Sequence, residues 1–299
     1  MSHLVAVTGS TGNVGKVLVR QLLKHGVRVR AIGRTLDKLA PLVAEGAEKW
    51  PGDLQDTDFV VRAFAGADAV FAMLPEHPNS PDFLADKRRS AASLAEALRR
   101  SHIRRVVALS AIGVNPPSGI GPAVANAEFE TMLQTIPGLS VVALRAAFLM
   151  ENLLPSIQII KTAGVNGSPI RADIALPMVS TSDIASVASG YLIDPTFDGY
   201  TVRPLLGPRD YTHREATAIL GAAIGRPELV YVEFPFEGFR QGLAAAGFSS
   251  TAANAVVELF MAFNEDRMRD MASRDASNTT PTTLEEFARD VFAPAYRAS

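Results

Sequence analysis

The stretch Thr8-Gly-Ser-Thr-Gly-Asn-Val-Gly15 decides how this sequence is expected to fold. It follows the apolar run 4–7, which is typical of a strand buried on both faces. It precedes apolar residues at helical spacing, Val14, Leu18 and Leu22. Glycines spaced G-x-x-G-x-x-G allow a tight turn, close approach of a diphosphate and close packing of helix on strand. The turn predicts a dinucleotide site at a helix N-terminus, with a purely structural turn as the alternative. The residues expected to bind are Gly9, Thr11, Gly12, Asn13, Val14 and Gly15.

Strand and helix patterns alternate through the first half of the chain. Strands are expected at 27–32, 47–50, 69–74, 106–109 and 140–144, and helices at 56–64, 83–100 and around 129–136. This βαβ alternation predicts an α/β fold, a doubly wound parallel sheet of the Rossmann type with right-handed crossovers.

The pattern changes after about residue 150. Capping boxes at Thr212–Glu215 and Thr282–Glu285 predict two helix starts, and 229–234 is expected to be a strand. We therefore expect an NAD(P)-binding domain over 1–150, with a returning segment near 176–208. Residues 151–299 are expected to form mainly a smaller α/β substrate domain.

Composition narrows the class of protein. The 299 residues carry 29 Lys and Arg against 31 Asp and Glu, a net charge of −2, which argues against direct nucleic-acid binding. The absence of cysteine excludes disulfides, thiol catalysis and Cys-ligated metals. No apolar run approaches the ~18 residues of a membrane span, and the first residues lack a signal-peptide pattern. We expect a cytoplasmic monomer or homodimer that acts on a small molecule.

Two cations follow the second predicted strand. Arg34 stands where an acidic residue would hold the ribose 2′-hydroxyl of NAD, and Lys38 lies one helical turn further on. Both can pair with a phosphate, so they favour NADP (NADPH) as the cofactor. The alternative is a pair of solvated surface cations.

Other candidates lie at the ends of the third and fourth predicted strands. Asp53 could accept a hydrogen bond from the adenine amino group, or it could cap a helix start. Its neighbour Leu54, together with Leu74 and Pro75, could flank the adenosine. The carboxyl ends of parallel strands border the crevice where ligands bind.

Several segments together resemble the NmrA-like branch of the short-chain dehydrogenase superfamily. They span nearly the whole chain and are 8–15, Arg34, 52–54, 109–110, 144–145, Phe148-x-x-Glu-Asn152, 182–185 and Pro281-Thr-Thr-Leu-Glu-Glu-Phe287. The resemblance implies a Rossmann domain, a small C-terminal substrate domain and NADP in the cleft. Members of this branch include quinone and azo-dye reductases, phenylpropanoid reductases and proteins that only sense the NADP/NADPH ratio.

The acid–base pair of typical short-chain dehydrogenases, Tyr-x-x-x-Lys, is absent. The first tyrosine is Tyr191, and no lysine lies between Lys87 and Lys161. Asn126 stands where related reductases keep a lysine; an amide can orient a ribose or a carbonyl but cannot transfer a proton. Asn126 is therefore a candidate catalytic residue through positioning alone.

Ser110 matches the superfamily's catalytic serine position, although it could equally satisfy loop backbone. Phe148 is expected at the nicotinamide end of the cleft, with core packing as the alternative. The histidines have no metal-ligand spacing and are expected at the surface: His3, His25, His77, His102 and His213. Only His77 follows a strand end near the cleft. No metal site is expected.

These features favour an NADPH-dependent reductase of a quinone-like or related conjugated acceptor. A quinone needs little acid–base help, because hydride addition gives a stabilised hydroquinone anion. The alternative is a non-catalytic NADPH sensor that binds a protein partner, and the missing Tyr-x-x-x-Lys pair makes an epimerase or dehydratase the weakest candidate.

Overall fold

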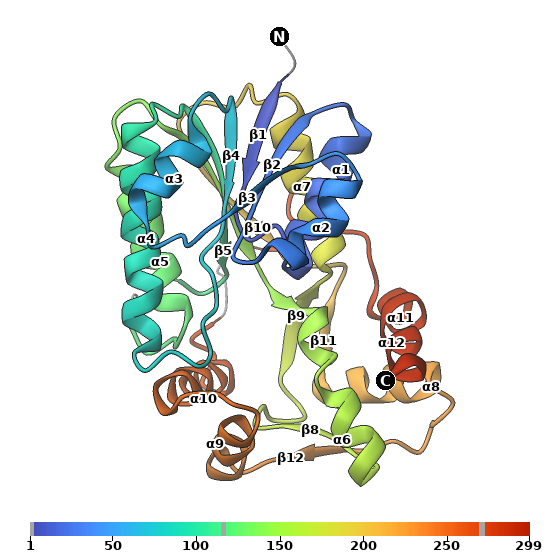
Figure 1. The fold of residues 1–299 in the computed structure, drawn as a ribbon. Helices are drawn as coiled ribbons and strands as arrows, with labels where there is room; N and C mark the ends of the chain where they lie inside the picture. The colour runs from blue at the N-terminus through green and yellow to red at the C-terminus, as the bar shows by residue number, and fades with distance from the viewer. Residues whose placement is uncertain (1–2, 115–117, 269–272) are drawn as a thin grey trace.

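The computed structural model describes residues 3–114, 118–268 and 273–299. Seven parallel strands of the described chain form the main sheet, in the order β3-β2-β1-β4-β5-β6-β10 (Figure 1). They are β1 (Leu4–Val7), β2 (Arg28–Gly33), β3 (Glu48–Pro51), β4 (Ala69–Ala72), β5 (Arg105–Ala111), β6 (Ser140–Ala146) and β10 (Tyr200–Leu205). The order reverses between β1 and β4, where a doubly wound sheet opens a crevice. The predicted Rossmann sheet is confirmed.

Helices cover both faces of this sheet (Figure 1). One face carries α1 (Asn13–Lys24), α2 (Leu36–Ala44) and α7 (Thr181–Ile193), and the other α3 (Thr57–Phe64), α4 (Phe83–Arg100) and α5 (Ala123–Gln134). Val5 and Val7 pack into the core beneath α1 and α7, whereas Ala6 packs into the core beneath α3 and α4. Because β1 is buried on both faces, its sequence is apolar at every position.

The chain leaves the main sheet after β6 and returns to it with α7 and β10. Residues 148–179 build strands and helices outside the sheet, after which α7 packs on α1 and β10 pairs with β6. The other elements are β7 (Phe148–Leu149), a 3₁₀ turn (Met150–Leu153), α6 (Ser156–Ala163), β8 (Asn166–Ser168), β9 (Ala175–Val179), β11 (Asp210–Thr212), α8 (His213–Ala223), β12 (Tyr231–Glu233), α9 (Phe236–Ala245), α10 (Ser250–Asn264), α11 (Leu284–Phe287), a π turn (Ala288–Phe292) and α12 (Ala293–Ala298). They enclose a second core around Phe148 and Phe263.

One of the two expected capping boxes begins a residue later than the sequence suggested. Thr212 and Glu215 cap α8 as expected. The second box is Thr283 with Glu286, whereas Thr282 was expected to start it. Thr282 is engaged elsewhere, because its backbone N–H and its hydroxyl both donate to the carboxylate of Asp183 on α7. None of the helices formed by the described residues is long and apolar enough to cross a membrane.

Candidate functional site

The glycine-rich turn between β1 and α1 has one open position and two closed ones. Gly9 has φ +62°, and a methyl group there would overlap the Met73 thioether. A methyl group at Gly15 would overlap the carbonyl oxygen of Gly9. At Gly12 the only atom within 4 Å would be that same oxygen, at 3.2 Å. Gly9 and Gly15 therefore shape the turn, and Gly12 leaves free space in front of it.

This turn is held rigidly and leaves backbone donors unused. The Gly12 N–H donates to the Gly9 oxygen at 2.9 Å, and the Ser10 hydroxyl donates to the Val7 oxygen at 2.7 Å. Gly12 is the N-cap of α1 and supplies no side-chain cap. The N–H groups of residues 13–15, which precede the first helical hydrogen bond from Lys16 to Gly12, are therefore available to an anion. The positive end of the helix dipole at this point favours a negatively charged group.

The two predicted phosphate-binding cations are exposed beside the same edge of the sheet. Arg34 directly follows β2, and Lys38 lies in the first turn of α2. Lys38 makes no hydrogen bond or ion pair with any described residue, which is compatible with both a solvated cation and a phosphate-binding one. Arg34 instead directs Nη1 at Nδ1 of His77, 3.2 Å away.

His77 belongs to the loop between β4 and α4, and its imidazole is half-buried. Burial lowers the pKa of His77, and the nearby Arg34 charge lowers it further. Asp53 and Glu76 act in the opposite direction, and Lys87 adds to the lowering. The imidazole is therefore uncharged at neutral pH.

The residues expected around the adenosine gather at the ends of β3 and β4. Asp53 Oδ1 accepts from the Gln55 N–H at 2.9 Å, which closes a local turn. Asp53 does not cap α3, because Asp56 does so by accepting from the N–H of Phe59. Leu54 and Leu74 are buried and Pro75 is half-buried, so this edge of the sheet is apolar. The Asp53 carboxylate beside it is exposed.

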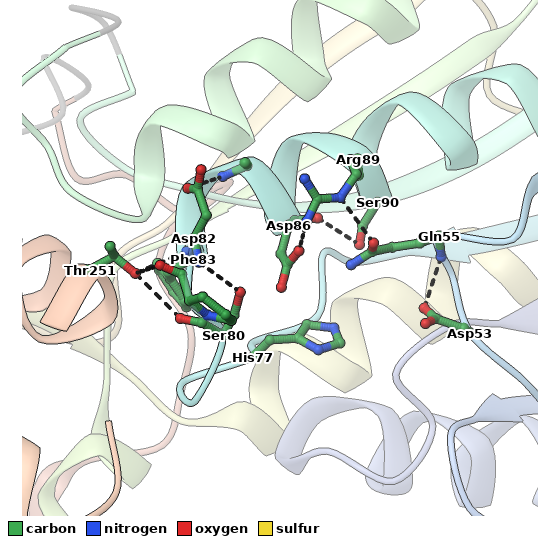
Figure 2. A network of polar contacts seen from close by, with 12 residues as sticks. Asp53, Gln55, His77, Ser80, Asp82, Phe83, Asp86, Arg89, Ser90 and Thr251 are labelled. Atoms are coloured by element: carbon green, nitrogen blue, oxygen red, sulfur yellow. Dashed lines mark hydrogen bonds and ion pairs between the residues drawn. The ribbon is translucent and has the colours of Figure 1, made fainter. Parts of the chain in front are cut away.

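A polar network joins this edge to the C-terminal helices (Figure 2). The Thr251 hydroxyl on α10 accepts from the Phe83 N–H and lies 3.3 Å from the Ser80 carbonyl oxygen. Further along α4, Arg89 donates to Gln55 and pairs with Asp86. Figure 2 shows His77 between these two groups of contacts.

The two polar candidates for catalysis differ in what surrounds them. The buried Ser110 hydroxyl donates to Glu130 at 2.5 Å, and the same carboxylate accepts from Arg145 and Tyr200. While this contact persists, Ser110 has no proton to donate to a ligand. Asn126, in the first turn of α5, is half-buried, and none of the described residues bonds to its amide.

Phe148 lies in the second core, edge-on to Phe263 and to His213, with ring centroids 5.9 Å and 5.6 Å apart. The expectation that His213 lies at the surface is wrong, because its side chain is 3% exposed. Burial lowers the pKa of His213 to about 4, so it is neutral. It follows Thr212, the α8 cap, and the apolar face of that helix turns it inward.

Two polar contacts near the site carried little sequence signal. Glu130 was not singled out, and only the structure shows that its buried carboxylate accepts hydrogen bonds from Ser110, Arg145 and Tyr200. Glu151 belongs to the Phe-x-x-Glu-Asn segment and accepts from the backbone and hydroxyl of Thr181, at the start of α7. Burial raises the pKa of the Glu151 carboxyl.

Comparison with known proteins gives one family and consistent relatives. A family model described as NAD(P)H-binding matches residues 9–194. The NAD(P)H azoreductase of Xenophilus azovorans is 28% identical over 257 residues, which cover 86% of each chain. The prestalk A differentiation protein A of Dictyostelium discoideum is 26% identical over 298 residues, 97% of this chain and 92% of that one.

Solved structures share the whole fold. The NADPH-dependent quinone oxidoreductase of Escherichia coli, complexed with NADPH, has a TM-score of 0.80 at 21% identity, covering 96% of this chain and 99% of its own. The triphenylmethane reductase of Citrobacter, complexed with NADP(H), has a TM-score of 0.76 at 19% identity, covering 99% and 100%. At such identities the likeness establishes the fold.

Proposed function

Because this chain belongs to the NAD(P)H-binding family, we propose that it is an NADPH-dependent reductase that transfers hydride to a quinone-like or related conjugated acceptor. The open space in front of Gly12, at the free N-terminus of α1, carries the proposal. A Cβ at Gly12 would meet one backbone oxygen, at 3.2 Å, and no other atom within 4 Å among the described residues, so packing alone gives a weaker reason for a glycine there than at Gly9 or Gly15. A bound diphosphate would give a stronger reason.

The residues around this open space are proposed to divide the cofactor between them. The α1 N–H groups would hold the diphosphate, and Arg34 and Lys38 the 2′-phosphate. Asp53 would accept from the adenine amino group, while Leu54, Leu74 and Pro75 would flank the adenosine. Bound NADPH would supply the hydride.

At the reacting end the chain offers positioning rather than proton transfer. Asn126 is proposed to orient the acceptor or the nicotinamide ribose, since no described residue bonds to its amide and an amide cannot act as a general acid or base. Phe148 is proposed to close the apolar end of the cleft. Acceptors whose reduced anion is stabilised by conjugation need no more than this. The azoreductase and quinone oxidoreductase names of the relatives agree with such an acceptor class.

Two measurements test the proposal. Titration calorimetry should give NADPH a tighter Kd than NADH by about 30- to 1,000-fold, the range for two charge-assisted contacts, and Arg34→Ala should remove most of the difference. NADPH oxidation should then proceed with a panel of quinones and azo dyes, with unactivated ketones as poor substrates. Equal Kd values would overturn the cofactor assignment. Tight NADPH binding without turnover on any acceptor would overturn the proposed reductase activity and favour the alternative, a non-catalytic NADPH sensor.

A further inference from the structure

Among the described residues, the imidazole of His77 has a single hydrogen-bond partner, and that partner is Arg34. An arginine can only donate, so Nδ1 of His77 accepts from Nη1 at 3.2 Å. In the neutral imidazole the proton therefore lies on Nε2. Nε2 is buried and has no partner among the described residues. Neither ring nitrogen forms a hydrogen bond within the described part of its own loop, so the one hydrogen bond of the imidazole is the one to Arg34.

The loop that carries His77 is fixed on both sides of it. Glu76, the preceding residue, pairs with Lys87, a cation 2% exposed on α4. Pro78, the following residue, accepts from the Ser249 N–H at 2.8 Å. Further along, Thr251 contacts the loop where it enters α4 (Figure 2). His77 is thus presented to Arg34 from a rigid frame.

We propose that His77 is a positioning residue that holds Arg34 ready for the cofactor's 2′-phosphate and so sets the preference for NADPH over NADH. The inference rests on the proposed function, in which Arg34 meets that phosphate. An exposed arginine has many rotamers, and ordering it on binding weakens affinity. A neutral acceptor at Nη1 orders the guanidinium beforehand and leaves its other N–H groups free.

Burial and four nearby charged groups explain why the imidazole remains a neutral acceptor. Arg34 comes from the end of β2, Asp53 from the loop after β3, Glu76 from its own loop and Lys87 from α4. The two cations and the two carboxylates offset each other, while burial disfavours the charged imidazole. A positively charged ring would repel Arg34 and could not accept its hydrogen bond.

The test measures Kd for NADPH and NADH in paired variants. His77→Leu keeps the volume but removes the acceptor, and should weaken NADPH binding about 3- to 10-fold while changing NADH binding less than about twofold. His77→Asn places an oxygen near the position of Nδ1 and should restore NADPH affinity to within about twofold. In the Arg34→Ala background, His77→Leu should have no further effect on NADPH.

His25→Leu is the matched control, because His25 is exposed at the end of α1 and its imidazole bonds, among the described residues, only to the Gln21 carbonyl. It should leave both Kd values unchanged, and thermal unfolding should show that every variant is folded. Two results would overturn the inference while leaving the NADPH preference intact. One is that His77→Leu weakens the binding of NADPH and NADH equally. The other is that His77→Leu weakens NADPH binding as much in the Arg34→Ala background as in the unmodified protein. Equal Kd values in the unmodified protein would overturn the proposed cofactor preference and this inference with it.

Discussion

Replacing Gly12 by valine should separate cofactor binding from folding. The backbone at Gly12 is extended, with φ −81° and ψ 178°, which a β-branched residue adopts readily. Its added Cβ would meet a single oxygen at 3.2 Å, and the two methyl groups would enter the proposed diphosphate space. The folding cost is that of a poor N-cap residue and one tight backbone contact, together about 1–2 kcal/mol, or about 2–8 °C in Tm for a chain of this size.

The same motif supplies the contrasting variant. Gly15→Ala adds only one methyl group, but this group overlaps the Gly9 carbonyl, which is backbone and cannot move aside. Overpacking of this kind costs about 3 kcal/mol or more, which lowers Tm by about 6 °C or more. The smaller substitution should therefore be the more damaging one to the fold.

Calorimetry with NADPH and thermal unfolding by circular dichroism give both readouts. Gly12→Val should weaken NADPH binding more than about 100-fold, or about 2.7 kcal/mol, while remaining folded. Retention of NADPH affinity within about threefold would refute the diphosphate site and leave the turn purely structural. A larger loss of Tm in Gly12→Val than in Gly15→Ala would refute the assignment of the two glycines.

Three further variants test other parts of the site. Asn126→Ala should lower turnover with a quinone about 10- to 100-fold without abolishing it, as one or two lost hydrogen bonds predict, and steady-state kinetics would show complete loss if the amide were indispensable. Ser110→Ala should cost about 1–2 kcal/mol in denaturant unfolding, because buried Glu130 loses a donor, and should change turnover less than about threefold; a tenfold fall would restore the catalytic role expected from the sequence. His213 has a folded pKa of about 4 against about 6.5 unfolded, so its stabilisation is complete above pH 6.5 and falls by about 2–3 kcal/mol as pH drops to 4.5. In His213→Phe that pH-dependent loss should be smaller by this amount, and an unchanged pH profile would contradict the assignment.

The sheet was readable from the sequence because its signals are local. Apolar runs such as 69–74 and stripes such as 83–100 depend only on neighbouring residues, and their order sets the topology. Thr282 and Thr283 show the limit of such signals. Both start a capping pattern, and the contact of Thr282 with Asp183, a residue far away in the sequence, decides between them.

The part of the candidate site that is built from backbone, the glycine-rich turn, could be predicted from the sequence. The glycine spacing predicted a turn with room for a diphosphate, and the structure identifies Gly12 as its open position. By contrast, the partners of Ser110 and Arg34 are side chains distant in sequence, Glu130 and His77, and no spacing pattern encodes them. His213 was expected at the surface because the residue type alone does not indicate that the apolar face of α8 buries it.

The late arrival of β10 has a consequence for how the protein is made. During synthesis β6 emerges complete at Ala146, but the strand that covers its edge begins only at Tyr200. At about 5–20 residues per second, the ribosome leaves that edge bare for roughly 3–10 s. A bare apolar edge is a template for pairing with another nascent chain, and β6 is buried at nearly every position in the finished fold. The main sheet is therefore closed only after translation has continued through residues 148–179, which lie outside it.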